Sequence, residues 1–164
     1  MLALVLSGGG ARGAYEAGVL RYVYETLGER LGREIAPSVI CGTSIGALTG
    51  AWVGALGRPG AGMLAKAWQE METEHVYRLA WRDLWPFGGG PFYRKTALGE
   101  GQALFDPTPL YDRLRDALPW GELHARIDRG ALRAFVVATT EVMTGRCVQF
   151  ADGAGLIPHQ TPTT

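Results

Sequence analysis

Short apolar runs alternate with amphipathic segments along the first third of the chain. Residues 2–6 form a continuous apolar run, which is typical of a strand buried on both faces of a sheet. Over residues 12–27 the apolar positions fall on one face at helical spacing, which predicts a helix ending near Gly28. Residues 38–41 predict a second buried strand, and the small residues after Gly46 predict a tightly packed helix. Strand, helix, strand and helix within about sixty residues indicate a right-handed crossover and a parallel sheet.

The rest of the chain continues this pattern with weaker signals. The expected elements are, in order, a glycine-rich loop over 57–62, helices over 63–75, 109–118 and 121–128, and strands over 131–142 and 146–150 joined by a turn at 144–145. The fold class predicted by the pattern is α/β, with a parallel-type sheet carrying helices on both faces in three layers.

Composition narrows the classes of protein that fit. Hydrophobic residues make up 47% and charged residues 20%, which is typical of a globular chain and argues against disorder. Lys and Arg balance Asp and Glu at 16 each, so no overall charge attracts nucleic acid. The first apolar run is too short for a signal peptide, and no stretch reaches membrane-spanning length, which predicts a cytoplasmic protein. Cys41 and Cys147 lie in apolar runs and are expected to be reduced core thiols, with no metal site and no cofactor.

The first glycine cluster has the spacing of a nucleotide-binding motif but lacks its other half. Gly8, Gly10 and Gly13 fit G-x-G-x-x-G after a strand and before a helix. A dinucleotide site needs a carboxylate where the second strand ends, and residues 41–44 read Cys-Gly-Thr-Ser. A phosphate-binding loop of the other common type needs Lys and Ser or Thr after its last glycine, where residues 14–15 are Ala and Tyr. Tight packing of a helix on a strand, or binding of another anion, remain as alternatives.

The second glycine cluster fits a nucleophile elbow. Gly42, Ser44 and Gly46 form G-x-S-x-G between a predicted strand and a predicted helix, the context in which a serine sits exposed on a strained turn. Both clusters follow neighbouring parallel strands, so they meet at one edge of the sheet. There the amides of Gly8–Gly10 can stabilise the oxyanion that forms when a serine attacks an ester. Arg12, beside them, is either a solvated surface residue or the partner of a carboxylate or an anionic substrate group.

These motifs, Ser7–Leu20 and Gly42–Leu48, together with Ala138–Phe150, resemble the patatin-like phospholipase family. The resemblance implies an acyl hydrolase that acts on lipid esters through a Ser–Asp dyad, without histidine, metal or cofactor. Ser44 matches the nucleophile. The residues that match the oxyanion loop and substrate site are Gly8, Gly9, Gly10, Arg12 and Gly13, and those that match the elbow are Gly42 and Gly46. The three histidines are expected on the surface: His75, His124 and His159.

The aspartate of the dyad is where the chain departs from the family pattern. Asp152–Ala154 has the letters of the family's Asp-Gly-Ala motif, but it directly follows the strand predicted to end at Phe150. Asp-Gly is a common turn pair, so we expect a turn there. We therefore expect the dyad aspartate beyond Thr164, and residues 1–164 to be the N-terminal portion of a single patatin-like domain.

Within that portion, residues 1–56 hold the glycine loop and the serine elbow, and residues 76–95 form an aromatic and basic insertion. Such a mixture suits either a crossing packed on the sheet or contact with a membrane surface by a peripheral protein. The expected partner is a lipid ester, with no nucleic acid. Two other functions stay open, namely a nucleotide- or anion-binding α/β module and a non-catalytic relative that binds lipid or a partner protein.

Overall fold

The computed structural model describes residues 1–71, 94–96, 99–101, 117–153 and 155. The chain divides into two compact units, one made of Met1–Gln69 and Pro119–Thr164 and the other of Glu70–Leu118. The second unit contains an antiparallel pair of short strands, β3 (Arg94–Thr96) and β4 (Gly99–Gly101), which the sequence pattern did not predict. Most of the insertion expected over 76–95 and of the helix expected over 109–118 lies outside the described residues.

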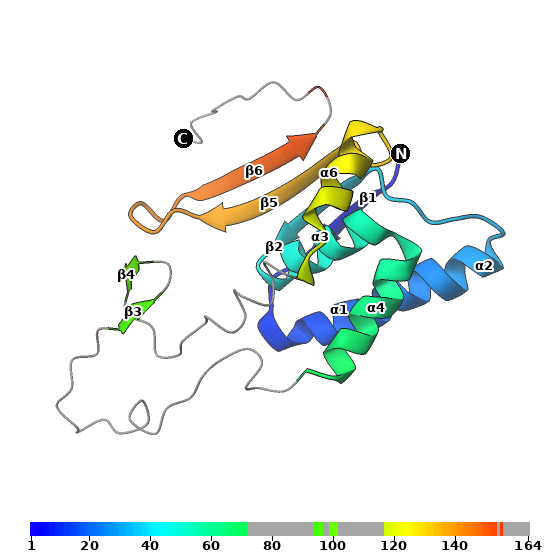
Figure 1. Ribbon diagram of the computed structural model, residues 1–164, viewed down its shortest axis with the longest axis horizontal. Coiled ribbons are helices and arrows are strands. Elements are labelled where there is room, and N and C mark those ends of the chain that lie inside the picture. The colour runs from blue at the N-terminus through cyan, green and yellow to red at the C-terminus, as the bar shows by residue number, and fades with distance from the viewer. Residues whose placement is uncertain (72–93, 97–98, 102–116, 154, 156–164) are drawn as a thin grey trace. The chain divides into compact units, whose positions relative to one another are not determined.

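The first unit is built on a four-stranded sheet (Figure 1). Its strands are, in spatial order, β1 (Ala3–Leu6), β2 (Val39–Thr43), β5 (Ala134–Thr140) and β6 (Cys147–Gly153). β1, β2 and β5 are parallel, and β6 returns antiparallel to β5 through a hairpin with Gly145 at φ 70°. The α/β class and the mainly parallel sheet are therefore confirmed, and so is the hairpin.

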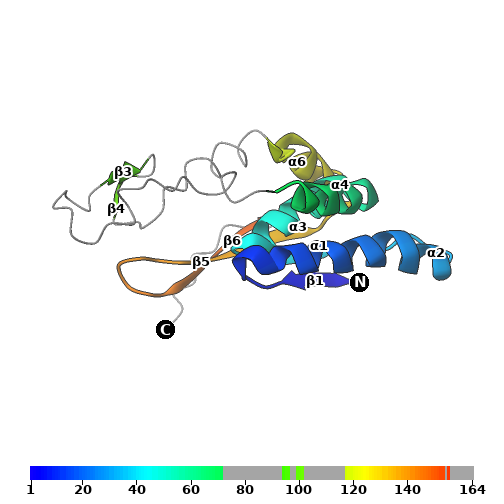
Figure 2. The same cartoon turned by 90° about the horizontal axis from the view of Figure 1, so that it is seen from below.

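Helices cover one side of this sheet. They are the 3-10 turn η1 (Gly10–Arg12), α1 (Gly13–Arg21), the π-helical segment η2 (Tyr22–Leu27), α2 (Gly28–Arg30), α3 (Ile45–Leu56), α4 (Arg58–Gln69) and α6 (Trp120–Asp128). Figure 2 shows α1, α3, α4 and α6 on the same side, because the steps from β1 to β2 and from β2 to β5 go the same way along the sheet with right-handed crossovers.

The other face of the sheet carries no helix from the described residues. Val5, in the first strand, is 76% exposed, so the expectation that this run is buried on both faces is wrong. The physical reason is that β1 pairs only with β2 among the described strands and turns Val5 away from the helices. The second helical layer that we expected is not among the described residues. No helix in the described part of the chain is both long and apolar enough to cross a bilayer.

Two glycine segments are helical where the sequence suggested breaks. The first helix does not stop at Gly28 but continues to Arg30, and Gly32, at φ 61°, ends it. The Gly32 amide donates to the Glu29 carbonyl and the Arg33 amide to that of Gly28, which is the hydrogen-bond pattern of a Schellman cap.

Most of the loop predicted over residues 57–62 is instead the start of α4, which begins at Arg58, while Gly57, at φ 62°, separates it from α3. Pro59 is tolerated there because the first helical amides need no intrahelical acceptor. Gly60 is required by close packing, since a Cβ at this position would lie 2.9 Å from Cβ of Leu56 and from the Trp52 carbonyl oxygen. The expected helix over 63–75 is thus the second part of α4, which ends at Gln69.

The buried helix predicted after the elbow is the centre of the core. α3 packs on β2 through two glycines, since a Cβ on Gly50 or on Gly54 would lie 2.9 Å or 3.3 Å from side-chain carbons of Ile40. Phe135 and Leu132 close the same core from the β5 side. This packing fixes the start of α3, and hence Ser44, against the end of β2.

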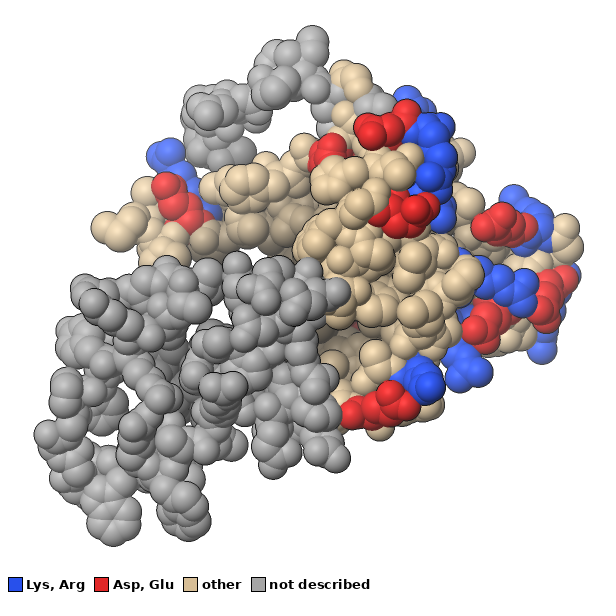
Figure 3. Space-filling model, viewed as in Figure 1, with Lys and Arg blue, Asp and Glu red and all other residues tan. Residues whose placement is uncertain are grey.

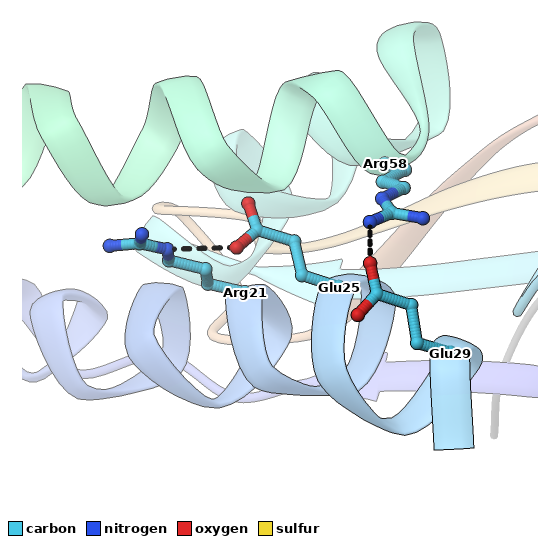
Figure 4. A network of polar contacts seen from close by, with 4 residues as sticks. All are labelled: Arg21, Glu25, Glu29 and Arg58. Carbon is cyan, nitrogen blue, oxygen red and sulfur yellow. Dashed lines mark hydrogen bonds and ion pairs between the residues drawn. The ribbon is translucent and has the colours of Figure 1, made fainter. Parts of the chain in front are cut away.

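Polar contacts lie along the outer helices and between them. Arg21 donates to Glu25 at 3.0 Å, and Arg58, at the start of α4, pairs with Glu29 of α2 (Figure 4). On the face drawn in Figure 3, acidic and basic side chains lie side by side rather than in patches of one sign. Such exposed pairs contribute about 0.2–1 kcal/mol each, so they add to the helix packing without deciding it.

The cysteines differ from expectation in one respect. Both are free thiols, but Cys41 is half-buried and Cys147 is exposed, so neither is a fully buried core residue. Cys147 begins β6, which is one of the two edge strands of the four-stranded sheet that the structure describes. In the described part of the chain, no group of three His, Cys, Asp or Glu side chains has a metal-binding arrangement.

Candidate active site

Ser44 occupies the turn between β2 and α3 in an unusual backbone conformation. It has φ 52° and ψ −124°, and it is the non-glycine residue with positive φ among the described residues. A side chain in such a region costs about 1–3 kcal/mol, a strain that clusters at functional sites. The residue is exposed, at the first turn of α3, where backbone N–H groups and the helix dipole favour negative charge.

The two glycines of the elbow allow strand, turn and helix to approach closely. A Cβ on Gly42 would lie 2.5 Å from the backbone nitrogen of Ala47, in the first turn of α3. A Cβ on Gly46 would lie 2.5 Å from the carbonyl oxygen of Leu6 and 2.6 Å from that of Ser7. Both obstacles are backbone atoms, so no rotamer change can relieve them. Gly46 thus lets α3 touch the point where β1 passes into the glycine loop.

The glycine loop lies beside Ser44. A Cβ placed on Gly8 would be 3.3 Å from Cβ of Ser44 and 3.5 Å from the Thr43 carbonyl oxygen. Gly10 has φ 55°, which an L side chain rarely adopts. Within the described residues, the amides of Gly8, Gly9 and Gly10 donate to no protein acceptor. The structure therefore brings the predicted serine and a row of unbonded backbone donors to one edge of the sheet.

Arg12 and Gly13 have different places in this loop. The Arg12 guanidinium folds over the glycines, with its Nε 2.8 Å from where a Cβ on Gly9 would be. Arg12 is exposed, and it makes no ion pair with any carboxylate that the structure describes. Gly13 is buried, and a Cβ there would lie 2.6 Å from both Ile45 and Trp68. Gly13 is thus a packing position that holds α1 against α3 and α4.

Asp152 lies far from Ser44. It is in β6 rather than in the expected turn, because the strand pairing continues to Gly153. In the sheet, Asp152 is paired with Phe135 of β5, and Phe135 is paired with Ile40 of β2. Ser44 is four residues beyond Ile40, about 13 Å along the strand, and two strand spacings away, about 10 Å across the sheet. This is the edge opposite to the elbow, so Asp152 cannot contact Ser44.

A histidine is the partner of Asp152. His124 Nε2 lies 3.3 Å from Asp152 Oδ2, and its Nδ1 lies 2.7 Å from the Trp120 carbonyl oxygen. His124 is exposed on α6, as expected, while His75 and His159 lie outside the described residues. The other described aspartate is Asp128, the last residue of α6. It lies shortly before the amino end of β5, and so it is also remote from the elbow.

A contact that sequence reasoning missed holds the glycine loop from the side of α1. The Ser7 hydroxyl donates to Glu16 Oε1 at 3.2 Å, and Glu16 Oε2 is buried with no hydrogen-bond partner in the described structure. The signal in the sequence is an acidic residue in the first turn of a helix, where the helix dipole favours it. That signal does not reveal the partner, because Ser7 precedes the helix by a loop whose path is not predictable.

Tyr24 is the described group with a clear pKa shift. Burial raises the pKa of Tyr24 to about 12, with nearby Arg126 opposing the shift and Glu34 adding to it. Tyr24 lines a small cavity between η2, the loop before β2, and α6, near the amino ends of the strands. Tyr24 is therefore a core residue at the edge of the sheet away from Ser44, and its role is to stabilise the fold.

The class of protein follows from the family that the chain matches. The strained serine turn and the glycine loop lie at the carboxyl ends of β2 and β1, at one edge of the sheet. A sequence profile of the patatin-like phospholipase family matches residues 4–158, and the chain belongs to that family. The resemblance seen in the motifs is confirmed, and the family is one of lipid acyl hydrolases. Comparisons with curated proteins and with solved structures gave no significant match.

Proposed function

We propose that the protein is a serine acyl hydrolase that cleaves lipid esters at Ser44. The observation that carries this proposal is the conformation of Ser44, held at positive φ between two glycines that tolerate no side chain. Nothing in a packed fold requires a serine under strain on an exposed turn, whereas an attacking hydroxyl needs this presentation.

In the proposed reaction, the Ser44 hydroxyl attacks the ester carbonyl while a carboxylate takes its proton. The free amides of Gly8–Gly10 stabilise the negative oxygen of the tetrahedral intermediate, and Arg12 adds positive charge at the loop. The carboxylic acid returns this proton to the leaving alcohol. Water then attacks the acyl-serine while the same carboxylate takes a proton from it, and the fatty acid leaves as the proton returns to Ser44. The family resemblance assigns the carboxylate to an aspartate, and both described aspartates lie at the other edge of the sheet.

Labelling with a fluorophosphonate tests the nucleophile. The wild-type protein should be labelled, and Ser44→Ala should not. Ser38→Ala is the matched control, because Ser38 lies at the amino end of the same strand and should leave labelling unchanged. Equal labelling of wild type and Ser44→Ala would refute the assignment. An unlabelled wild type that binds nucleotide would favour the anion-binding module, and one that binds lipid vesicles would favour the non-catalytic relative.

The proposal includes contact with a lipid surface at the edge that holds Ser44. The β5–β6 hairpin extends past the end of β2 (Figure 1), since β5 continues beyond Ala138, the residue opposite Thr43. Its tip carries Val142 and Met143, which are 93% and 90% exposed. Two neighbouring apolar side chains fully in water are suited to insertion into lipid beside the site. The aromatic and basic insertion over residues 76–95, for which membrane contact was one of two expectations, lies outside the described residues except for residues 94–95.

A further inference from the structure

Ser7 is the junction between the first strand and the glycine loop, and its backbone is fixed from the α3 side. The carbonyl oxygens of Leu6 and Ser7 occupy the space that a Cβ on Gly46 would need. The next residue, Gly8, lies against Cβ of Ser44. Any movement of Ser7 therefore moves the amides of the loop relative to the nucleophile.

The side chain of Ser7 is fixed from the opposite side by a carboxylate. Its hydroxyl donates to Glu16 Oε1 at 3.2 Å, and the other oxygen of Glu16 is buried without a partner among the described residues. An unsatisfied buried carboxylate oxygen is destabilising. An apolar side chain would remove this cost, so stability alone does not account for glutamate at this position.

We propose that Glu16 is a positioning residue of the oxyanion loop, acting through Ser7. This inference rests on the proposed function. Glu16 holds the Ser7 hydroxyl from α1 while α3 abuts the Ser7 carbonyl, so the amides of Gly8–Gly10 keep their place beside Ser44. No hydrogen bond joins Glu16 to Ser44 among the described residues, since its Oε1 accepts from Ser7 and its Oε2 is buried without a partner.

The test compares Glu16→Ala, Glu16→Gln and Ser7→Ala in the whole protein. Loss of the contact lets the loop shift, and we expect the fluorophosphonate labelling rate and the kcat for a p-nitrophenyl ester to fall about tenfold or more in Glu16→Ala and Ser7→Ala, with KM nearly unchanged. Glu16→Gln keeps an acceptor for the Ser7 hydroxyl and should retain most of the rate. The double variant should be no slower than either single variant, because both remove one contact.

Two outcomes would overturn the proposal. Wild-type rates in Glu16→Ala would show that the contact does not position the loop. Equal loss in Glu16→Gln and Glu16→Ala, with loss of the acid limb of the pH profile, would make Glu16 the base itself. Glu25→Ala is the control, because this carboxylate lies on the same helical run but pairs with Arg21 at the surface. It should label at the wild-type rate.

A second readout separates this proposal from the proposed function. The Arg12 amide donates to the Gly9 carbonyl at 3.1 Å, so its hydrogen exchange reports the order of the loop whether or not the protein is a catalyst. The Arg12 amide should exchange faster in Glu16→Ala and Ser7→Ala than in wild type, and its exchange rate should be unchanged in Glu16→Gln. Unlabelled wild type with this exchange pattern would overturn the hydrolase function while keeping the contact. Labelled wild type with unchanged exchange and rates would overturn the positioning role alone.

Discussion

Gly46→Ala tests the packing that brings the glycine loop to Ser44. The added Cβ would start 2.5 Å from the Leu6 carbonyl oxygen, against 3.4 Å for an ordinary contact, so α3 and the loop must separate by about 0.9 Å. Both sides are backbone and cannot rotate away. Overpacking of this kind costs about 1–3 kcal/mol of unfolding free energy. A displacement near 1 Å at a catalytic centre also costs on the order of 100-fold in rate.

Gly18→Ala is the matched control for this variant. Gly18 is on the exposed side of α1, and a Cβ there would meet nothing within 4 Å. Alanine should therefore stabilise the helix by about 0.5–1 kcal/mol and leave the labelling rate unchanged. Urea denaturation measures the unfolding free energy, and the fluorophosphonate labelling rate reports the site. A Gly46→Ala protein that matches wild type in both measurements would refute the reasoning.

Three further predictions follow from single features. Ser44→Gly should be about 1 kcal/mol more stable than Ser44→Ala in urea, because glycine removes the strain of positive φ, and equal stability would contradict this. Because the pKa of Tyr24 rises from 10.0 to about 12, folding favours its neutral form. The contribution of Tyr24 to the free energy of unfolding is full below pH 10 and is lost as the pH approaches 12, a decrease of up to about 2–3 kcal/mol. This alkaline decrease should be absent in Tyr24→Phe, and an equal decrease in both proteins would contradict the prediction. Replacing Val142 and Met143 with serine should lower co-sedimentation with lipid vesicles at least about tenfold, since burying both side chains in lipid contributes about 3 kcal/mol to binding. The control Leu31→Ser, at the opposite edge of the sheet, should leave co-sedimentation unchanged.

Elements with strong local signals could be predicted from the sequence. The run that became β1 is apolar throughout, β2 begins with the apolar residues 39–41, and the small residues of α3 are those that a central packed helix needs. The elbow was predictable because its two glycines and its serine satisfy a local steric requirement between a strand and a helix. The position of the glycine loop then followed from the rule that parallel strands end at one edge.

Features that depend on distant contacts could not be predicted. Gly60 looks like a loop residue until Leu56 and Trp52 are placed against it, and Gly28 looks like a helix stop until Gly32 provides the cap. The exposure of Val5 depends on which side of the sheet the helices occupy, and no local pattern contains that information. The link between Ser7 and Glu16 likewise requires the path of the loop between them.

Strand direction, rather than motif letters, decides whether Asp152 can belong to the site. β1, β2 and β5 deliver their carboxyl ends to the edge that holds Ser44, while β6 runs back and ends at the other edge. An aspartate at the end of this antiparallel strand therefore cannot contact Ser44, whatever the residues around it. Asp152→Asn should label at the wild-type rate and lose only its contact with His124, an exposed pair that contributes about 0.2–1 kcal/mol at most. Loss of labelling in a folded Asp152→Asn protein would mean that the register of β6 on β5 is wrong. The carboxylate that we propose to activate Ser44 would therefore enter at the edge where the glycine loop and the elbow meet.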